Sequence, residues 1–84
     1  MVGVDTTQLA GTRVTVVGLA RSGVAAARLL EEVGAVVTVT DRKDRRELLG
    51  VLDSLNQATT RVVLGKDYEG ALDTAELVVI SPGV

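Results

Sequence analysis

The sequence predicts an α/β fold built on an open parallel sheet, and three observations lead to this prediction. Short β-branched runs alternate with alanine- and leucine-rich segments along the 84 residues. The chain is 46% hydrophobic but contains a single aromatic residue, Tyr68, so its core must be aliphatic, as in parallel sheets covered by helices. The residues from Arg13 to Asp41 have the length and pattern of one strand–helix–strand unit.

The first half of the chain contains the clearest elements. After a lead-in over residues 1–11, in which Leu9 is expected to pack near the sheet, a strand is predicted over 13–17. A helix then begins near Ser22 and ends at Gly34, because glycine favours helix C-termini. The second strand is predicted over residues 36–40.

The second half predicts a shorter helix and two more strands. Asp44 and Glu47 form an Asp-x-x-Glu capping pattern before a helical leucine spacing, although Gly50 lies inside this helix. Two further strands are expected over residues 60–64 and 77–80. A helical turn is expected between them, over residues 68–72.

Right-handed crossovers place these strands in the order 3-2-1-4, which is half of a Rossmann-like doubly wound domain flanked by helices. In that order Gly18, Asp41 and Ser81 each follow the C-terminal end of a strand. They therefore converge on one edge of the sheet, in the crevice where such folds bind ligands.

The glycine turn after the first strand predicts a phosphate site. Gly18 and Gly23 have the spacing of the outer glycines in a Gly-x-Gly-x-x-Gly loop, with Ala20 in the middle position. The amides of Arg21, Ser22 and Gly23 stand at the helix N-terminus, where the helix dipole favours an anion. The alternative is that the glycines only permit a tight turn and close packing.

Further candidate positions follow strands two and four. Asp41 stands at about the 20-residue spacing at which an acid binds a ribose or base, and Arg42 and Lys43 are placed to pair with phosphate. Ser81, followed by Pro82 and Gly83, offers a hydroxyl, a rigid bend and a glycine amide. The alternatives are a solvated strand end and helix start for the first group, and a strand terminator for the second group.

Composition excludes several function classes. The chain has no cysteine and no histidine, which removes disulfides, thiol chemistry, ordinary zinc sites and imidazole-dependent triads. A net charge of −2 with mixed signs provides neither a basic face for nucleic acid nor a polybasic patch for membranes. We therefore expect no metal site, no nucleic-acid partner and no membrane partner. Residues 1–9 show neither a basic leader nor a sustained apolar run, and the sequence has no 18 consecutive apolar residues, so we expect a cytoplasmic protein.

Four stretches together resemble the N-terminal domain of the Mur ligases, over about residues 9–84. They are Gly18 to Gly23, Val37 to Lys43, Val62 to Gly65, and Leu77 to Val84, which contains Ser-Pro-Gly. The resemblance is greatest to the ligases that add D-glutamate to UDP-N-acetylmuramoyl-L-alanine during peptidoglycan synthesis, and thus in cell-wall biogenesis, cell shape and cell division. The middle position of the turn departs from the family, which usually has a second glycine there.

The resemblance implies a substrate-binding role. In that family the N-terminal domain holds the UDP part of the substrate, while ATP, magnesium and the acyl-phosphate chemistry belong to a central and a C-terminal domain. It implies that the amides of Arg21 and Ser22 meet the diphosphate, that Asp41 and Arg42 meet the uracil, and that Gly83, with Ser81, closes over the diphosphate.

The resemblance also implies that residues 1–84 are a single UDP-substrate-binding domain at the N-terminus of a longer, three-domain ligase. This chain would then have no catalytic residue and no cofactor of its own, and would be inactive without the other domains. The alternative is an NAD(P)-binding module of a dehydrogenase or sensor, with Asp41 on the ribose or Arg42 on the 2′-phosphate. A regulatory or assembly domain that binds no nucleotide is the third interpretation.

Overall fold

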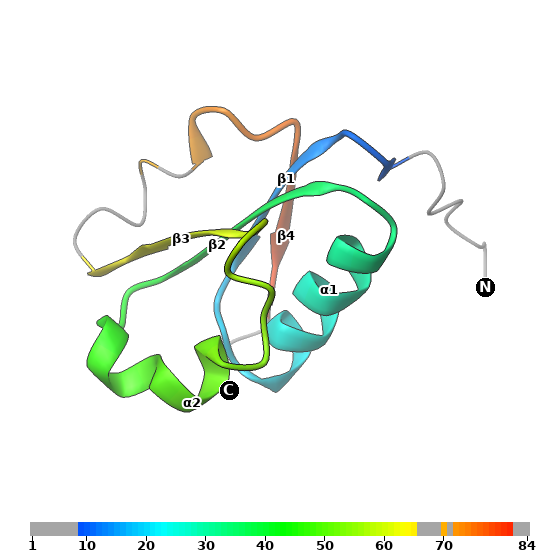
Figure 1. Cartoon of the computed structure of the whole chain (residues 1–84). Helices are drawn as coiled ribbons and strands as arrows, with labels where there is room; N and C mark the ends of the chain where they lie inside the picture. The colour runs from blue at the N-terminus through cyan, green and yellow to red at the C-terminus, as the bar shows by residue number, and fades with distance from the viewer. Residues whose placement is uncertain (1–8, 66–69, 71, 82–84) are drawn as a thin grey trace.

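The computed structural model describes residues 9–65, 70 and 72–81, and contains a four-stranded parallel sheet in the order β3-β2-β1-β4 (Figure 1). The elements are β1 (Arg13–Val17), α1 (Arg21–Glu32), β2 (Val36–Asp41), the 3₁₀ helix η2 (Arg45–Leu48), α2 (Leu49–Leu52), β3 (Arg61–Leu64) and β4 (Leu77–Ile80). The predicted α/β class and strand order are confirmed.

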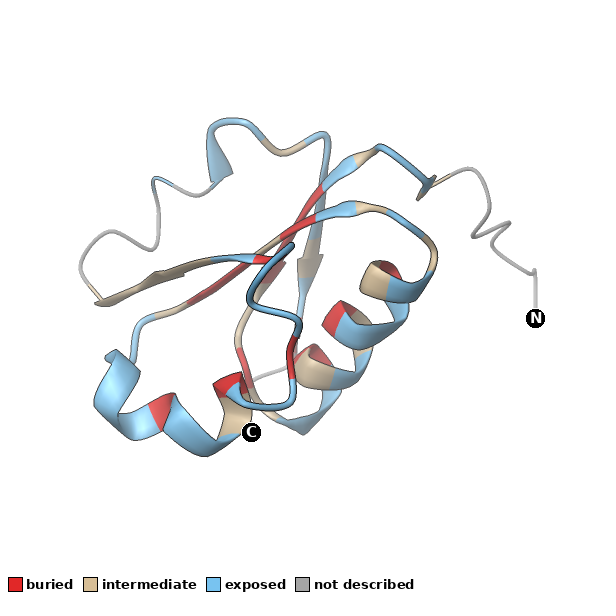
Figure 2. Ribbon diagram, viewed as in Figure 1, coloured by how far each residue is buried: buried red, intermediate tan, exposed pale blue. Residues whose placement is uncertain are grey.

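The core lies between one face of the sheet and the helices. Parallel pairing aligns Val14 with Val37 and Val16 with Val39, so the alternation along each strand directs all four valines to the same face. Figure 2 shows buried positions in the middle of the sheet and on the sides of the helices that face it. The buried hydrophobic residues are Val14, Val16, Leu19, Ala27, Leu30, Val37, Val39, Leu48, Leu52 and Leu55.

Gly34 ends helix α1 as predicted. Its φ of 85° lies in the left-handed region, which glycine adopts without a Cβ clash. The Gly34 amide donates to the Glu31 carbonyl at 3.2 Å, and the Ala35 amide donates to the Leu30 carbonyl at 3.1 Å. This pair of bonds is the Schellman arrangement, which returns the chain directly into β2.

The second helical segment is shorter than its leucine spacing predicts. Its predicted cap is confirmed, since Asp44 Oδ1 accepts a hydrogen bond from the Glu47 amide at 3.1 Å. The segment divides into η2 and α2, and α2 ends at Leu52. The Ser54 hydroxyl donates to the Val51 carbonyl at 2.7 Å and competes with continuation of the helix.

Three other expectations concern element boundaries. Strand β2 extends one residue further than predicted, because Asp41 pairs with Leu64 of β3. Strand β3 begins one residue later, because the Thr60 amide donates to the Asn56 carbonyl at 2.9 Å. Leu9 packs against the core as expected, whereas most of the predicted turn over 68–72 lies outside the described residues.

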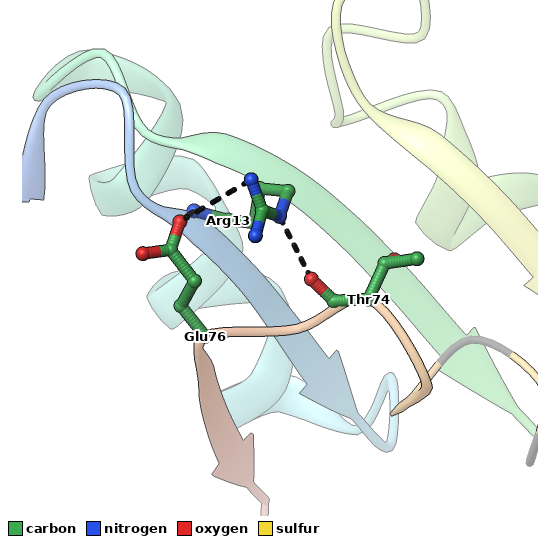
Figure 3. A network of polar contacts seen from close by, with 3 residues as sticks. All are labelled: Arg13, Thr74 and Glu76. Atoms are coloured by element: carbon green, nitrogen blue, oxygen red, sulfur yellow. Dashed lines mark hydrogen bonds and ion pairs between the residues drawn. The ribbon is translucent and has the colours of Figure 1, made fainter.

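A polar corner joins the beginnings of β1 and β4 (Figure 3). Arg13 Nε donates to the Thr74 carbonyl at 2.8 Å, and the Arg13 amide donates to Glu76 Oε1 at 3.1 Å. The accompanying ion pair, with 3.7 Å between Arg13 Nη1 and Glu76 Oε1, is exposed and contributes little stability by itself. The corner fixes the register of β4 beside β1 and thereby brings Ser81 to the opposite edge of the sheet.

Candidate functional site

The candidate site lies where β1, β2 and β4 end and α1 begins (Figure 1). Gly18, directly after β1, has φ = 95°, a conformation that other residues rarely adopt. Its amide donates to the Thr40 carbonyl of β2 at 2.8 Å. This bond turns the backbone out of the sheet toward the start of α1.

Gly23 lets α1 approach this turn closely. A Cβ atom at this position would lie 1.9 Å from the Gly18 carbonyl oxygen and 3.2 Å from the Ser81 Cβ. Only glycine fits at this point, so close packing requires the second glycine of the turn. This packing holds the first turn of α1 against both β1 and β4.

Ala20, in the middle position of the glycine pattern, is the N-cap residue of α1. Its φ of −70° and ψ of 178° are open to any residue, so the alanine introduces no backbone strain. Ala20 makes no side-chain capping bond. The amides of the first helical turn, from Arg21 to Gly23, therefore lack the side-chain acceptor that an N-cap residue usually supplies.

The charge at this helix N-terminus also favours an anion. The first turn of α1 contains no acidic residue, and the exposed Arg21 places a positive charge at the positive end of the helix dipole. In an isolated helix, the repulsion between such a charge and the helix dipole costs from a few tenths of a kcal/mol up to about 1 kcal/mol. An anion bound between the two would be attracted by both the charge and the dipole. Arg21 and the adjoining amides form a cationic, donor-rich surface.

The end of β4 contacts the start of α1 directly. The Ser22 and Ser81 hydroxyl oxygens are 2.6 Å apart and share a hydrogen bond, and the Ser81 amide donates to the Val17 carbonyl at 2.9 Å. Ser81 is buried, whereas Ser22 is exposed. The structure thus brings Gly18, Ser22, Gly23 and Ser81 into one cluster, as the strand order predicts.

The Asp41 carboxylate lies beside this cluster and accepts hydrogen bonds from two backbone amides. Its Oδ2 accepts a hydrogen bond from the Leu19 amide at 2.8 Å, and its Oδ1 accepts one from the Lys43 amide at 2.9 Å. Arg42, the next residue, is exposed. Gly83 lies outside the described residues.

Sequence reasoning considered Lys43 only for its charge and missed the backbone amides of Leu19 and Lys43, which both donate to Asp41. No residue-type signal marks a backbone donor, because its direction depends on the conformation of the turn. The burial of the Leu19 side chain, which is 2% exposed, anchors its amide in place.

A groove runs from the turn along α1 to α2, with a volume of about 540 Å³. We call it the α1–α2 groove; its lining residues are Leu19, Ala20, Arg21, Val24, Ala25, Arg28, Val51 and Ser54. Its volume is within the range of small-molecule sites. Among the predicted site residues that the structure describes, Arg21 is the one that lines it, so the groove adjoins the Ser22–Ser81 pair.

Two features are absent from the described residues. Within this part of the chain, no three side chains of the metal-ligating acidic type are grouped to hold a metal ion. In the same residues, no helix has the length and apolar character needed to cross a membrane. The chemistry available at the site is that of hydroxyls, a carboxylate, a guanidinium and backbone amides.

Comparison with known proteins points to one family. Residues 12–84 match the family described as Mur ligase MurD-like, N-terminal domain. The chain is 56% identical over 77 residues to the UDP-N-acetylmuramoylalanine–D-glutamate ligase of Anaeromyxobacter dehalogenans, covering 92% of this chain and 16% of the relative. The ligases of the same name from Geobacter metallireducens and Trichlorobacter lovleyi are each 47% identical, over 92% of this chain and 17% of their own length.

The comparison confirms the family resemblance seen in the sequence. The chain spans about one sixth of the length of these curated relatives. The matched region includes the glycine turn, Asp41, Ser81 and Gly83. The chain belongs to the MurD-like N-terminal domain family of the Mur ligases.

Proposed function

We propose that this chain binds the UDP part of UDP-N-acetylmuramoyl-L-alanine, with the diphosphate at the N-terminus of α1. The observation that carries this proposal is the pairing of an uncapped helix N-terminus with the exposed Arg21. Backbone amides, a guanidinium and the Ser22 hydroxyl suit a diphosphate, because all of them donate hydrogen bonds to anionic oxygens. The names of the relatives include a UDP-linked compound, which supports this choice of nucleotide.

The proposed site follows the sheet edge. The amides of Arg21 and Ser22 hold the diphosphate, Gly18 and Gly23 shape the turn, and Ser81 closes the side next to β4. The family resemblance assigns Gly83 to the diphosphate as well. Asp41 and Arg42 stand on the side next to β2, where the uracil lies. UDP is the ligand here, in preference to a nicotinamide dinucleotide.

The remainder of the proposal concerns the longer protein. We propose that the chain is the N-terminal domain of an ATP-dependent ligase that joins D-glutamate to the substrate in the cytoplasm. ATP and magnesium are bound by the central and C-terminal domains of that protein. The 84-residue chain alone then binds substrate but does not catalyse ligation.

Equilibrium titration of the chain with UDP, UDP-N-acetylmuramoyl-L-alanine, NAD and NADP tests this function. Both uridine compounds are expected to bind saturably, and Arg21→Ala is expected to weaken UDP binding about tenfold, through loss of charge-assisted hydrogen bonds. Arg61→Ala is the matched control, because this exposed arginine begins β3 at the opposite edge of the sheet. Saturable binding of NAD or NADP without any response to the uridine compounds would overturn the proposal.

A further inference from the structure

Asp41 bridges two separate segments of the backbone. Oδ2 receives the amide proton of Leu19 in the β1–α1 turn, at 2.8 Å, and Oδ1 receives that of Lys43 in the loop after β2, at 2.9 Å. Both bonds have an ionised acceptor and short distances, which places them among the stronger protein hydrogen bonds. The carboxylate therefore acts as a clamp between the glycine turn and the end of β2.

The clamp reinforces a neighbouring bond. The residue before Leu19, Gly18, donates its amide to the Thr40 carbonyl at 2.8 Å, so two consecutive amides of the turn are held by two consecutive residues of β2. The Leu19 side chain is buried in the core and prevents the turn from rotating about this pair. The orientation of the next residues, Ala20 and Arg21, follows from these contacts.

We propose that Asp41 is a positioning residue for the diphosphate site, and that it acts through the Leu19 amide. The inference rests on the proposed function, since it assigns Asp41 to the diphosphate part of UDP in addition to the uracil part. Amides at a helix N-terminus bind an anion well only when their direction is fixed before the anion arrives. The two amide protons also spread the negative charge of Asp41, which would otherwise repel a diphosphate at the same sheet edge.

The test combines Asp41→Asn with two probes, inorganic pyrophosphate and UDP, each titrated into the 84-residue chain. A positioning role predicts that pyrophosphate and UDP affinities both fall about tenfold. The asparagine oxygen can still accept one of the two amide protons, but its NH₂ group is a donor and cannot accept the other. One of the two hydrogen bonds of the clamp is therefore lost. If UDP affinity falls while pyrophosphate affinity stays within twofold of the wild-type value, Asp41 acts on the nucleoside alone and the positioning role is wrong.

Asp44→Asn is the matched control. Asp44 also accepts a backbone amide proton, from Glu47 at 3.1 Å, and the substitution removes the same charge from the N-cap of η2, in the segment that follows β2. It leaves the glycine turn untouched, so its pyrophosphate affinity is expected to stay within twofold of the wild-type value. A tenfold loss in this control would mean that overall charge, and not the clamp, determines anion affinity.

Amide NMR of the unliganded chain supplies a readout that does not depend on UDP. The clamp predicts that Asp41→Asn moves the Leu19 amide proton upfield and speeds its exchange with solvent at least tenfold, while the Val16 amide is unchanged. An unaffected Leu19 amide would refute the clamp. A wild-type chain that binds neither UDP nor pyrophosphate would contradict the proposed function, and with it the anion-positioning role, whatever the Leu19 result.

If the Asp41→Asn variant does not fold, the clamp can be tested on the wild-type chain by following the amide protons during UDP binding. The clamp predicts that saturating UDP leaves the Leu19 and Lys43 amide protons hydrogen-bonded and slow to exchange. An upfield shift of both protons on UDP binding would show that the Asp41 carboxylate leaves them for the ligand, which would overturn the proposal.

Discussion

Replacing Gly23 by alanine is expected to lower the free energy of unfolding by about 3 kcal/mol, the upper end of the usual cost of overpacking. The new Cβ would lie 1.9 Å from the Gly18 carbonyl oxygen and 3.0 Å from the Gly18 carbonyl carbon. Both neighbours are backbone atoms, so α1 would have to move away from β1. For a domain of this size that loss corresponds to a fall in Tm of roughly 12–24 °C, measurable by thermal denaturation.

Gly50→Ala is the matched control for this substitution. Gly50 lies inside α2, where a Cβ atom would have no neighbouring atom within 4 Å, and its φ is not positive. Alanine there is expected to stabilise the chain by about 0.5–1 kcal/mol, because it reduces the conformational freedom of the unfolded chain. A Gly23→Ala variant as stable as the wild type would contradict the close approach of α1 to the glycine turn.

Replacing Leu52 by alanine is expected to cost about 3 kcal/mol. Leu52 is 1% exposed and is among the largest fully buried side chains of the described residues. Its removal leaves a cavity under α2 in addition to the lost burial, and such changes cost about 2–5 kcal/mol. Urea denaturation followed by circular dichroism measures the difference.

Leu49→Ala tests whether burial causes this effect. Leu49 belongs to the same short helix but is 57% exposed, so its truncation is expected to change stability by no more than about 0.5 kcal/mol. Equal losses for the two variants would indicate that α2 does not pack on the sheet as the structure shows.

The sheet was predictable from the sequence because its signals are local. The valine-rich runs predict β1 and β4 to the residue, and Gly34 predicts the end of α1. The crossover rule then supplies the strand order without further information. The limits of the second helix were not predictable, because the Ser54 hydroxyl bond that competes with it depends on the folded backbone.

The place of the candidate site, at the C-terminal ends of the strands, was predictable from the sequence. Strand order places the ends of β1 and β4, and with them Gly18 and Ser81, side by side. The 2.6 Å contact between the Ser22 and Ser81 hydroxyls also needs the close approach of α1 at Gly23. The partners of Asp41 were not predictable, since a carboxylate after a strand suits a ribose as well as a backbone amide. The direction of the Leu19 amide decides between these partners, and only the folded turn fixes that direction.

The most direct test of a UDP site at the β1–α1 turn is to map amide chemical shifts of the chain during UDP titration. The predicted result is that the largest saturable shifts occur at Arg21 and Ser22, with smaller changes at Leu19. Shifts confined to Val51 and Ser54, on the α2 side of the α1–α2 groove, with no change at Arg21 and Ser22, would contradict a diphosphate site at the start of α1.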